Sequence, residues 1–404
     1  MADERLTILI AARDEEARIG TTVAELQRLF PSVEVIVADD GSRDSTAHIA
    51  ASAGARVLRL PHRGKGQALT LAEREAPPGT ILLCDADLRG DLTPLLDGDS
   101  DLTVAAFVRR QGGGFGIAKT AARCLIELAS GFPATEPLSG QRRLTQKARD
   151  ALFPLAAGFG CESAMTADAV NARLEIDERR LELEHRATGR DLKGFVHRGR
   201  QLRDIVLAFG PQGRNHRGLR LPLVGWVVAL AQPALLPVAA IGAADDLWSG
   251  EERGFRGHLR AGRTTGVLKL VGIPAYALLR TRSVSGAILV GLSANLINQL
   301  DTRPGRALKA YLAASIPLRA PSGIAVLLLT YDLREMAMLG DSGSNTLGAM
   351  LGLRSVGRLT ERQRWSAIAA LAGLTLLGER RSLGASIEST PVFRSLDAWG
   401  RQES

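Results

Sequence analysis

Two aspartates, Asp85 and Asp87, are separated by one residue and follow directly after the apolar run ILLC at positions 81–84. A short apolar run of this kind predicts a buried strand, so both carboxylates would lie just beyond its end. Carboxylate oxygens suit Mg²⁺ or Mn²⁺, and a metal held there can neutralise a departing pyrophosphate. A strand-end turn with two solvated aspartates would have the same sequence, and the pair alone leaves both interpretations open.

Polar segments that contain glycine or acidic residues also follow the three strands expected earlier in the chain. They are RDEE at 13–16, DDGSRDS at 39–45 and HRGKG at 62–66. In open α/β sheets, ligands bind at the edge where the strands end. Asp39 and Asp40 could there accept hydrogen bonds from a base, and Lys65, between two glycines, could contact a phosphate. These neighbours strengthen the metal-site interpretation of Asp85 and Asp87.

Alternating strands and helices must position these segments. Short β-branched runs predict strands, and the charged stretches between them predict helices, which together indicate a mostly parallel α/β sheet. The expected strands are Leu6–Ala12, Val33–Ala38, Arg56–Leu60, Thr80–Cys84 and Leu102–Val108. The expected helices are Asp14–Phe30, Ser45–Ala53 and Lys65–Ala76.

The order of these motifs resembles that of the family 2 glycosyltransferases of the GT-A type. The matching runs are AARDEEARI, VADDGSRDST, RGKGQAL and LCDADL, and later PLSGQRR and GFGCE look like the family's acceptor-side segments. The resemblance covers about residues 5–205. Family members with similar motifs include polyprenyl-phosphate sugar transferases and glucosyl-phosphoglycerate synthases. It implies a nucleotide-diphospho-sugar transferase domain of the GT-A fold over residues 1–210.

The resemblance also implies a role for individual residues. Nucleotide-sugar binding would fall to Ala11, Arg13, Glu15, Asp39, Asp40 and Lys65, with Lys65 on the diphosphate side. Asp85 would contact the sugar or ribose, Asp87 would bind Mg²⁺ or Mn²⁺, and His185 would be a further metal or diphosphate ligand. Glu162 would position or deprotonate the acceptor in an inverting displacement. Without the resemblance, Glu162 could simply begin a helix and His185 could be an ordinary surface histidine.

Two buried-looking cysteines flank the predicted site residues. Cys84 precedes Asp85, and Cys161 precedes Glu162. We interpret both as small apolar fillers rather than nucleophiles.

The chain becomes more apolar after residue 210. Residues 221–244 and 283–300 carry no charge, and shorter apolar stretches follow at 320–331, 342–353 and 365–378. A span of about 20 apolar residues can cross a bilayer, so the pattern predicts an all-α polytopic membrane domain over residues 211–404. Arginines between the first two apolar segments would place that loop, and the N-terminal domain, on the cytoplasmic side of the cell membrane. Buried helices of a soluble core are the alternative.

Three polar clusters interrupt these apolar segments: GAADDL, NLINQLDTRPGRAL and MLGDSGSNTLG. They resemble motifs of the polyprenyl-phosphate N-acetylhexosamine-1-phosphate transferases, in which such residues surround a Mg²⁺-diphosphate. The resemblance covers about residues 214–400 and implies a second site. Its residues would be Asp245, Asp246, Asn298, Asp301 and Asp341. Pro304 stands where the family often has another aspartate, and the family's early helices and His-rich loop are missing, so a non-catalytic membrane platform is the alternative.

Composition excludes several classes of protein. Apolar residues make up 45% of the 404 residues, which excludes global disorder, and three cysteines cannot form a disulfide scaffold. The net charge of +8 suggests an anionic partner. Aromatic residues are only 4% and no nucleic-acid module is recognisable, so we expect lipid and phosphate rather than nucleic acid.

These observations lead to three hypotheses. The first is a membrane-associated glycosyltransferase of envelope glycan synthesis that moves a sugar from a UDP- or GDP-linked donor to a lipid-phosphate or lipid-linked acceptor. The second is a glycosyltransferase for a small soluble phosphorylated acceptor, with a membrane half that serves only as an anchor. The third is a non-enzymatic membrane scaffold.

Overall fold

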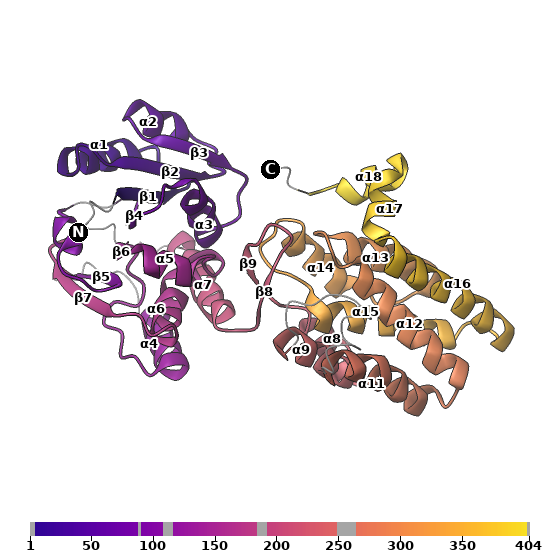
Figure 1. The fold of residues 1–404 in the computed structure, drawn as a ribbon. Helices are drawn as coiled ribbons and strands as arrows, with labels where there is room; N and C mark the ends of the chain where they lie inside the picture. Colours follow the sequence, from indigo (N-terminus) through magenta and orange to yellow (C-terminus); the bar gives the residue numbers. More distant parts are fainter. Residues whose placement is uncertain (1–4, 88–89, 108–115, 184–191, 249–263, 402–404) are drawn as a thin grey trace. The chain divides into compact units, whose positions relative to one another are not determined.

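A computed structural model describes residues 5–87, 90–107, 116–183, 192–248 and 264–401 (Figure 1). The chain divides into two units. The N-terminal unit consists of the residues up to Gly210 together with Gly218–Arg220, and the C-terminal unit consists of Pro211–Arg217 and the residues from Leu221 onward. Each unit has its own core and is described separately.

A seven-stranded sheet forms the centre of the N-terminal unit, in the order β3-β2-β1-β4-β6-β5-β7. The strands that we predicted all form, and β1 and β3 have the predicted bounds. β6 is antiparallel to both of its neighbours, and neither β6 nor β7 was predicted. The strands are β1 (Leu6–Ala12), β2 (Glu34–Asp40), β3 (Arg56–Leu60), β4 (Thr80–Asp85), β5 (Leu102–Phe107), β6 (Arg142–Leu144) and β7 (Ile176–Leu181).

Helices cover both faces of this sheet. Successive side chains of a strand point to opposite faces, and in β1 Ile8 and Ile10 belong to the core on the α1 side, whereas Leu9 belongs to the core on the α3 side. The unit is therefore a three-layer α/β structure. Its helices are α1 (Ile19–Leu29), α2 (Thr46–Ser52), α3 (Lys65–Glu75), α4 (Ile117–Ser130), α5 (Gln146–Leu152), α6 (Cys161–Asn171) and α7 (Leu192–Ala208).

The first predicted helix begins later than expected. We placed its start at Asp14, but α1 begins at Ile19, and Asp14 has a positive φ of 55°. Asp14 instead accepts a hydrogen bond from the backbone N–H of Arg43 at 2.8 Å. Residues 14–18 thus form a loop at the carboxyl edge of the sheet, and Asp14 and Glu16 bind the loop after β2, since Glu16 accepts from the backbone N–H of Ser45 at 3.0 Å.

The C-terminal unit is helical apart from the short strands β8 (Gln212–Arg214) and β9 (Arg220–Pro222), the second of which begins in the N-terminal unit. Small residues let its central helices approach closely: a Cβ added at Gly348 of α15 would lie 2.3 Å from the carbonyl oxygen of Ser293 in α12. Its helices are α8 (Val227–Ala231), α9 (Leu236–Trp248), α11 (Thr264–Thr281), α12 (Val284–Leu300), α13 (Arg306–Leu318), α14 (Gly323–Asp332), α15 (Gly340–Val356), α16 (Glu361–Arg380), α17 (Leu383–Ser389) and α18 (Pro391–Ala398).

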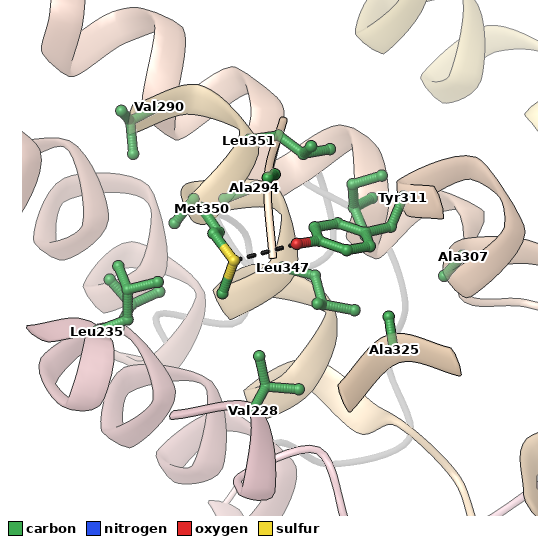
Figure 2. Packing of buried hydrophobic residues seen from close by; sticks show 14 of the residues in the cluster. Val228, Leu235, Val290, Ala294, Ala307, Tyr311, Ala325, Leu347, Met350 and Leu351 are labelled. Atoms are coloured by element: carbon green, nitrogen blue, oxygen red, sulfur yellow. Dashed lines mark hydrogen bonds between the residues drawn. The ribbon is translucent and has the colours of Figure 1, made fainter. Parts of the chain in front are cut away.

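Side chains from several of these helices meet in one apolar core (Figure 2). Tyr311 of α13 is fully buried there, and its hydroxyl donates to Sδ of Met350 in α15 at 3.0 Å. Burial raises the pKa of Tyr311 to about 12, so the phenol stays protonated at neutral pH. The C-terminal unit is thus a folded bundle with its own close-packed interior.

The first predicted membrane span is wrong as a single helix. Residues 221–244 are divided among the end of β9, helix α8, the 3₁₀ turn Pro233–Leu235 and the start of α9. Proline fixes φ and cannot donate a backbone hydrogen bond, and Pro233 follows Gln232, whose φ of −138° is not helical. The second predicted span is α12, which has 17 residues. Across the described ranges, no helix combines the length and the hydropathy that crossing a membrane requires.

Candidate active site

The carboxyl ends of β1, β2 and β4 lie side by side and bring three predicted residues together. In the strand register, Ala11 pairs with Asp85 on one side and with Ala38 on the other, and Ala12 pairs with Asp39. The turn after β4 is fixed from α1, where the Thr22 hydroxyl donates to the carbonyl of Ala86 at 2.8 Å. The parallel sheet therefore places Ala11, Asp39 and Asp85 at one edge, where doubly wound sheets bind ligands.

Lys65 joins two of the predicted catalytic carboxylates. Its Nζ lies 2.5 Å from Oδ1 of Asp85 and 2.6 Å from Oε1 of Glu162. Lys65 begins α3 and Glu162 stands in the first turn of α6, so two helix N-termini and one strand end converge here. Burial disfavours the charged ammonium, but the ion pairs with Asp85 and Glu162 outweigh that cost and raise the pKa of Lys65 well above its ordinary value. The lysine is therefore a permanent cation at neutral pH.

Gln141, which the sequence analysis did not single out, completes the surroundings of Asp85. Its Nε2 donates to Oδ2 of Asp85 at 2.8 Å, opposite the oxygen that Lys65 contacts. The neighbouring Gly140 lets the backbone approach this carboxylate, because a Cβ at Gly140 would lie 2.4 Å from Oδ1 of Asp85. Both residues belong to the PLSGQRR segment of the sequence, and membership of that motif was the sequence feature that could have pointed to Gln141 as a site residue.

Gly140→Ala is expected to slow turnover of the donor by about 10- to 100-fold, because displacing Asp85 by about an ångström disturbs the alignment of the reacting groups. Gly199→Ala in α7 is the matched control, since a Cβ there meets no atom within 4 Å. Initial rates of nucleotide release measure both variants. Equal rates for the two would show that the contact between Gly140 and Asp85 has no part in the reaction.

Asp87 is the open carboxylate of the pair. It is half-buried, and among the described residues it makes no hydrogen bond or ion pair. His185, the other predicted metal ligand, lies outside the described residues. Within those residues, no three His, Cys, Asp or Glu side chains are grouped to hold a metal ion. One open carboxylate fits Mg²⁺ or Mn²⁺ when a substrate diphosphate supplies further oxygens, as such ions usually bind.

Asp40 and Asp39 hold loops in this structure. Asp40 accepts from the backbone N–H groups of Arg63 and Gly64 and lies 2.7 Å from Nδ1 of His62. Asp39 accepts from the backbone N–H of Ser42 at 3.1 Å. These contacts fix the HRGKG loop against β2, and the contact of either aspartate with a base stays a prediction.

His62 also connects Asp40 to the first predicted nucleotide ligand. Nη1 of Arg13 lies 2.5 Å from Nε2 of His62, the ring nitrogen that faces away from Asp40. Glu15 lies nearby in the same loop, where its carboxylate accepts from Arg18 at 3.1 Å. Arg13, His62 and Asp40 thus form a chain of contacts along the edge of the sheet, and His62 is a residue that the sequence analysis quoted but did not assign.

The two cysteines of the site are buried thiols. Burial raises the pKa of Cys84 well above its ordinary value, and burial together with the adjacent Glu162 does the same for Cys161. A thiol held protonated is a poor nucleophile. Both side chains belong to the apolar cores of the unit, which agrees with their interpretation as small fillers.

The C-terminal unit brings together most of the second predicted site, around a lysine that was not predicted. Nζ of Lys269 in α11 lies 2.7 Å from Asp245 of α9 and 2.6 Å from Asp341 of α15. Asp246 accepts from the backbone N–H groups of Asp341 and Ser342 at 2.9 and 3.0 Å, where α15 begins. The signal for Lys269 was a single charge inside an otherwise apolar helical segment, VLKLVGIPAYALL.

Asn298 and Asp301 adjoin the same cluster from α12. With its amide nitrogen turned toward Asp341, Asn298 donates to that carboxylate at 2.7 Å and accepts from Lys269 at 3.2 Å. Burial and the nearby carboxylates, Asp332 first among them, raise the pKa of Asp301 well above its ordinary value. Burial likewise raises the pKa of Asp341 to about 7.

A metal does not fit this cluster as it stands. Lys269 already occupies the space between Asp245 and Asp341 and is ion-paired with both, and Asp246 accepts from the backbone at the start of α15. The arrangement gives no open set of carboxylates like the one that the resemblance implied, and a second transferase site stays a prediction.

Comparisons with known proteins concern the N-terminal half. The sequence profile of glycosyl transferase family 2 matches residues 7–124. A glucosyl-3-phosphoglycerate synthase of Mycolicibacterium paratuberculosis is 30% identical over 210 residues, which covers 44% of this chain and 63% of that protein. The chain thus spans just under two thirds of that relative. A 4,4′-diaponeurosporenoate glycosyltransferase of Staphylococcus aureus is 38% identical over 89 residues, covering 20% of this chain and 24% of that protein.

Solved structures give a similar result. Glucosyl-3-phosphoglycerate synthase from Mycobacterium tuberculosis, in complex with Mn²⁺, uridine diphosphate and phosphoglyceric acid, is 26% identical. The similarity covers 51% of this chain and 78% of that chain, with a TM-score of 0.43. Another structure of that enzyme contains Mg²⁺ and uridine diphosphate.

Proposed function

We propose, from the glycosyl transferase family 2 domain that the N-terminal half carries, that this protein transfers a sugar from a UDP-linked donor to a small phosphorylated acceptor. The observation that carries the proposal is the cluster of Asp85, Lys65 and Glu162 at the strand ends, with the open Asp87 beside it. Glucose as the sugar and a phosphoglycerate as the acceptor are supported by the mycobacterial relative, whose name states them.

The residues divide the work of the transfer. Lys65 is the permanent cation of the site, and its ammonium turns from Asp85 toward the donor diphosphate as the donor enters. Asp85 then accepts from sugar or ribose hydroxyls, and Gln141 holds its second oxygen. When bound, Mg²⁺ or Mn²⁺ at Asp87 neutralises the charge of the departing diphosphate.

Glu162 serves the acceptor side. Its carboxylate orients the acceptor hydroxyl and takes its proton as the oxygen bonds to the anomeric carbon and the nucleoside diphosphate leaves with the electron pair of the broken bond. The buried position of Glu162, at 6% exposure, keeps water from competing for the same carboxylate.

Incubation of the full chain with UDP-glucose, 3-phosphoglycerate and Mn²⁺ tests this function. We expect a glucosylated phosphoglycerate and UDP, detected by mass spectrometry, and neither product when the metal is chelated. A chain that neither binds nor turns over any nucleotide sugar with Mg²⁺ or Mn²⁺ would show the proposal to be wrong.

A lipid-linked acceptor is the second candidate. Of 27 large apolar side chains exposed among the described residues, 22 belong to the C-terminal unit, which favours a location of that unit at the cell membrane. The diaponeurosporenoate glycosyltransferase relative also supports an apolar acceptor. Polyprenyl phosphate in detergent micelles, offered in competition with 3-phosphoglycerate, separates the two: the true acceptor is consumed first.

A further inference from the structure

The last helix of the chain, α18, is attached to the C-terminal unit by its polar side. Asp397 is the one residue of α18 that is buried, and its carboxylate accepts from Nε and Nη2 of Arg306 at 2.9 and 2.8 Å. Arg306 is itself only 4% exposed and also binds Glu388 of α17. The helix is therefore fixed in orientation by a buried ion pair.

A second cation, Lys309, binds the C-terminal end of α18. Nζ of Lys309 donates to the backbone carbonyls of Asp397 and Trp399, each at 2.6 Å. Arg401 adds a third cation, which binds Asp397 at 2.6 Å. Three cations from the bundle and the chain end thus hold the acidic side and the C-terminal carbonyls of α18, as expected for positive charge at the end of a helix.

The opposite side of α18 is apolar and exposed. Val392, Phe393, Leu396 and Trp399 are 68%, 56%, 62% and 74% exposed. Positions 392, 396 and 399 follow one another at spacings of four and three residues, and Phe393 precedes Leu396 by three, so the four side chains adjoin one another on the surface of the helix and its C-cap. A surface helix of a protein in water usually buries its apolar face and leaves its acids in solvent. α18 does the reverse, and the ion pair of Arg306 and Asp397 enforces it.

The chemistry of this face and of its surroundings favours lipid as the occupant. Trp is enriched at the boundary of a bilayer, and Trp, Phe and Leu form the apolar face of helices that lie in that boundary. Positive charge is in excess among the exposed side chains of α18 and the end of α16. Arg380, Arg381 and Arg394 are exposed there against one unpaired acid, Glu379, because Glu388 is paired with Arg306. Helix α16, which packs against α17, also exposes Leu376 and Leu377 in its last turns, so further apolar side chains are exposed at the end of α16 that leads into α17. Cations around an exposed apolar face complement anionic headgroups.

We propose that α18 is an interfacial membrane helix, which lies in the headgroup region of an anionic bilayer with Phe393, Leu396 and Trp399 directed into the acyl boundary. The ion pair of Arg306 with Asp397 presents this face before the protein meets the membrane. The inference deepens the proposed membrane location of the C-terminal unit and is independent of the transfer reaction.

Vesicle binding by the full chain tests the proposal. Phe393→Ser with Leu396→Ser is expected to lower the partition coefficient onto phosphatidylcholine vesicles that contain phosphatidylglycerol by about tenfold or more. Ile117→Ser with Leu128→Ser is the matched control, because these side chains of α4 are 63% and 84% exposed in the other unit. Binding of the control should equal that of the unaltered chain. Equal binding by the α18 variant would overturn the proposal, even if the chain as a whole binds vesicles.

Two further measurements identify the contact as lipid. Brominated lipids should quench tryptophan fluorescence, and Trp399→Phe should remove part of that quenching, whereas Arg394→Gln should weaken binding to vesicles with phosphatidylglycerol but not to phosphatidylcholine alone. Quenching that stays complete in Trp399→Phe would mean that protein rather than lipid covers this face. A change in the oligomeric state of the α18 variant, without any change in its vesicle binding, would mean the same. Transfer to a soluble phosphorylated acceptor should be equal in all variants, which separates failure of this proposal from failure of the proposed activity.

Discussion

Replacing Asp87 by asparagine is expected to lower the proposed sugar transfer by about 10³-fold while the fold stays intact. Asp87 is the open carboxylate at the strand end, and the metal that it would bind stabilises the departing diphosphate by several kcal/mol, at about 1.4 kcal/mol for each tenfold in rate. Asparagine keeps the shape but loses the charge that attracts a divalent cation. The rate of UDP release, measured over a titration of Mn²⁺, should fall and should need more metal to saturate.

Asp97→Asn provides the control for the change of charge. Asp97 is also an aspartate at the end of a short element, the 3₁₀ turn Thr93–Leu96. Its side chain is 77% exposed, and its carboxylate lies 3.8 Å from the guanidinium of Arg179. A surface substitution of this kind should change the rate by no more than about twofold. If Asp87→Asn or Asp87→Ala keeps full transfer activity, the metal role of Asp87 is wrong. If Asp87→Ala loses transfer activity but still complements a deletion, a non-enzymatic scaffold becomes the better hypothesis.

Replacing Lys269 by methionine is expected to destabilise the C-terminal unit by about 3–5 kcal/mol, because a buried ion pair that loses one partner leaves an uncompensated charge. The Lys269 side chain is 18% exposed and is ion-paired with both Asp245, which is 4% exposed, and Asp341, which is 27% exposed. All four tryptophans of the chain lie after residue 220. Denaturant unfolding followed by tryptophan fluorescence therefore reports on this unit directly.

Two companion variants make the test specific. Lys147→Met removes an ion pair with Asp101 whose lysine is 67% exposed, and an exposed pair is worth about 1 kcal/mol or less. Adding Asp245→Asn and Asp341→Asn to Lys269→Met should recover part of the lost stability, since the unpaired charges are then gone. Equal losses for Lys269→Met and Lys147→Met would show that the three-residue cluster does not stabilise the bundle.

The sequence predicted the strands of the N-terminal unit well because strand patterning is local. β1 and β3 have the predicted bounds, α2 is one residue shorter than predicted at each end, and α3 is one residue shorter at its C-terminal end. The motifs at 13–16, 39–45, 62–66 and 85–87 follow strands that are adjacent in a parallel sheet, so their meeting at one edge could be predicted as well. β6 was missed because its three residues, Arg142–Leu144, are too few to carry a pattern.

Contacts between distant segments could not be predicted in the same way. The sequence suggested that Asp85 and Glu162 act separately, whereas Lys65 joins them. Asp40 was assigned to a base but binds the loop at 62–64, and its partner His62 had no assignment. The uncharged segment 221–244 suggested one long helix, yet its prolines divide it into shorter elements.

What the sequence determined by itself was the family-like order of motifs, the α/β character of the first half and the apolar helical character of the second. Alternation, turn residues and charge act between near neighbours, so a linear pattern is enough to establish them. Only the tertiary structure decided which charges neutralise one another, as where Lys269 meets Asp245 and Asp341, 24 and 72 positions away. The reason is physical: the free energy of a buried charge depends on the partners that packing brings within about 3 Å, and packing follows from the whole fold.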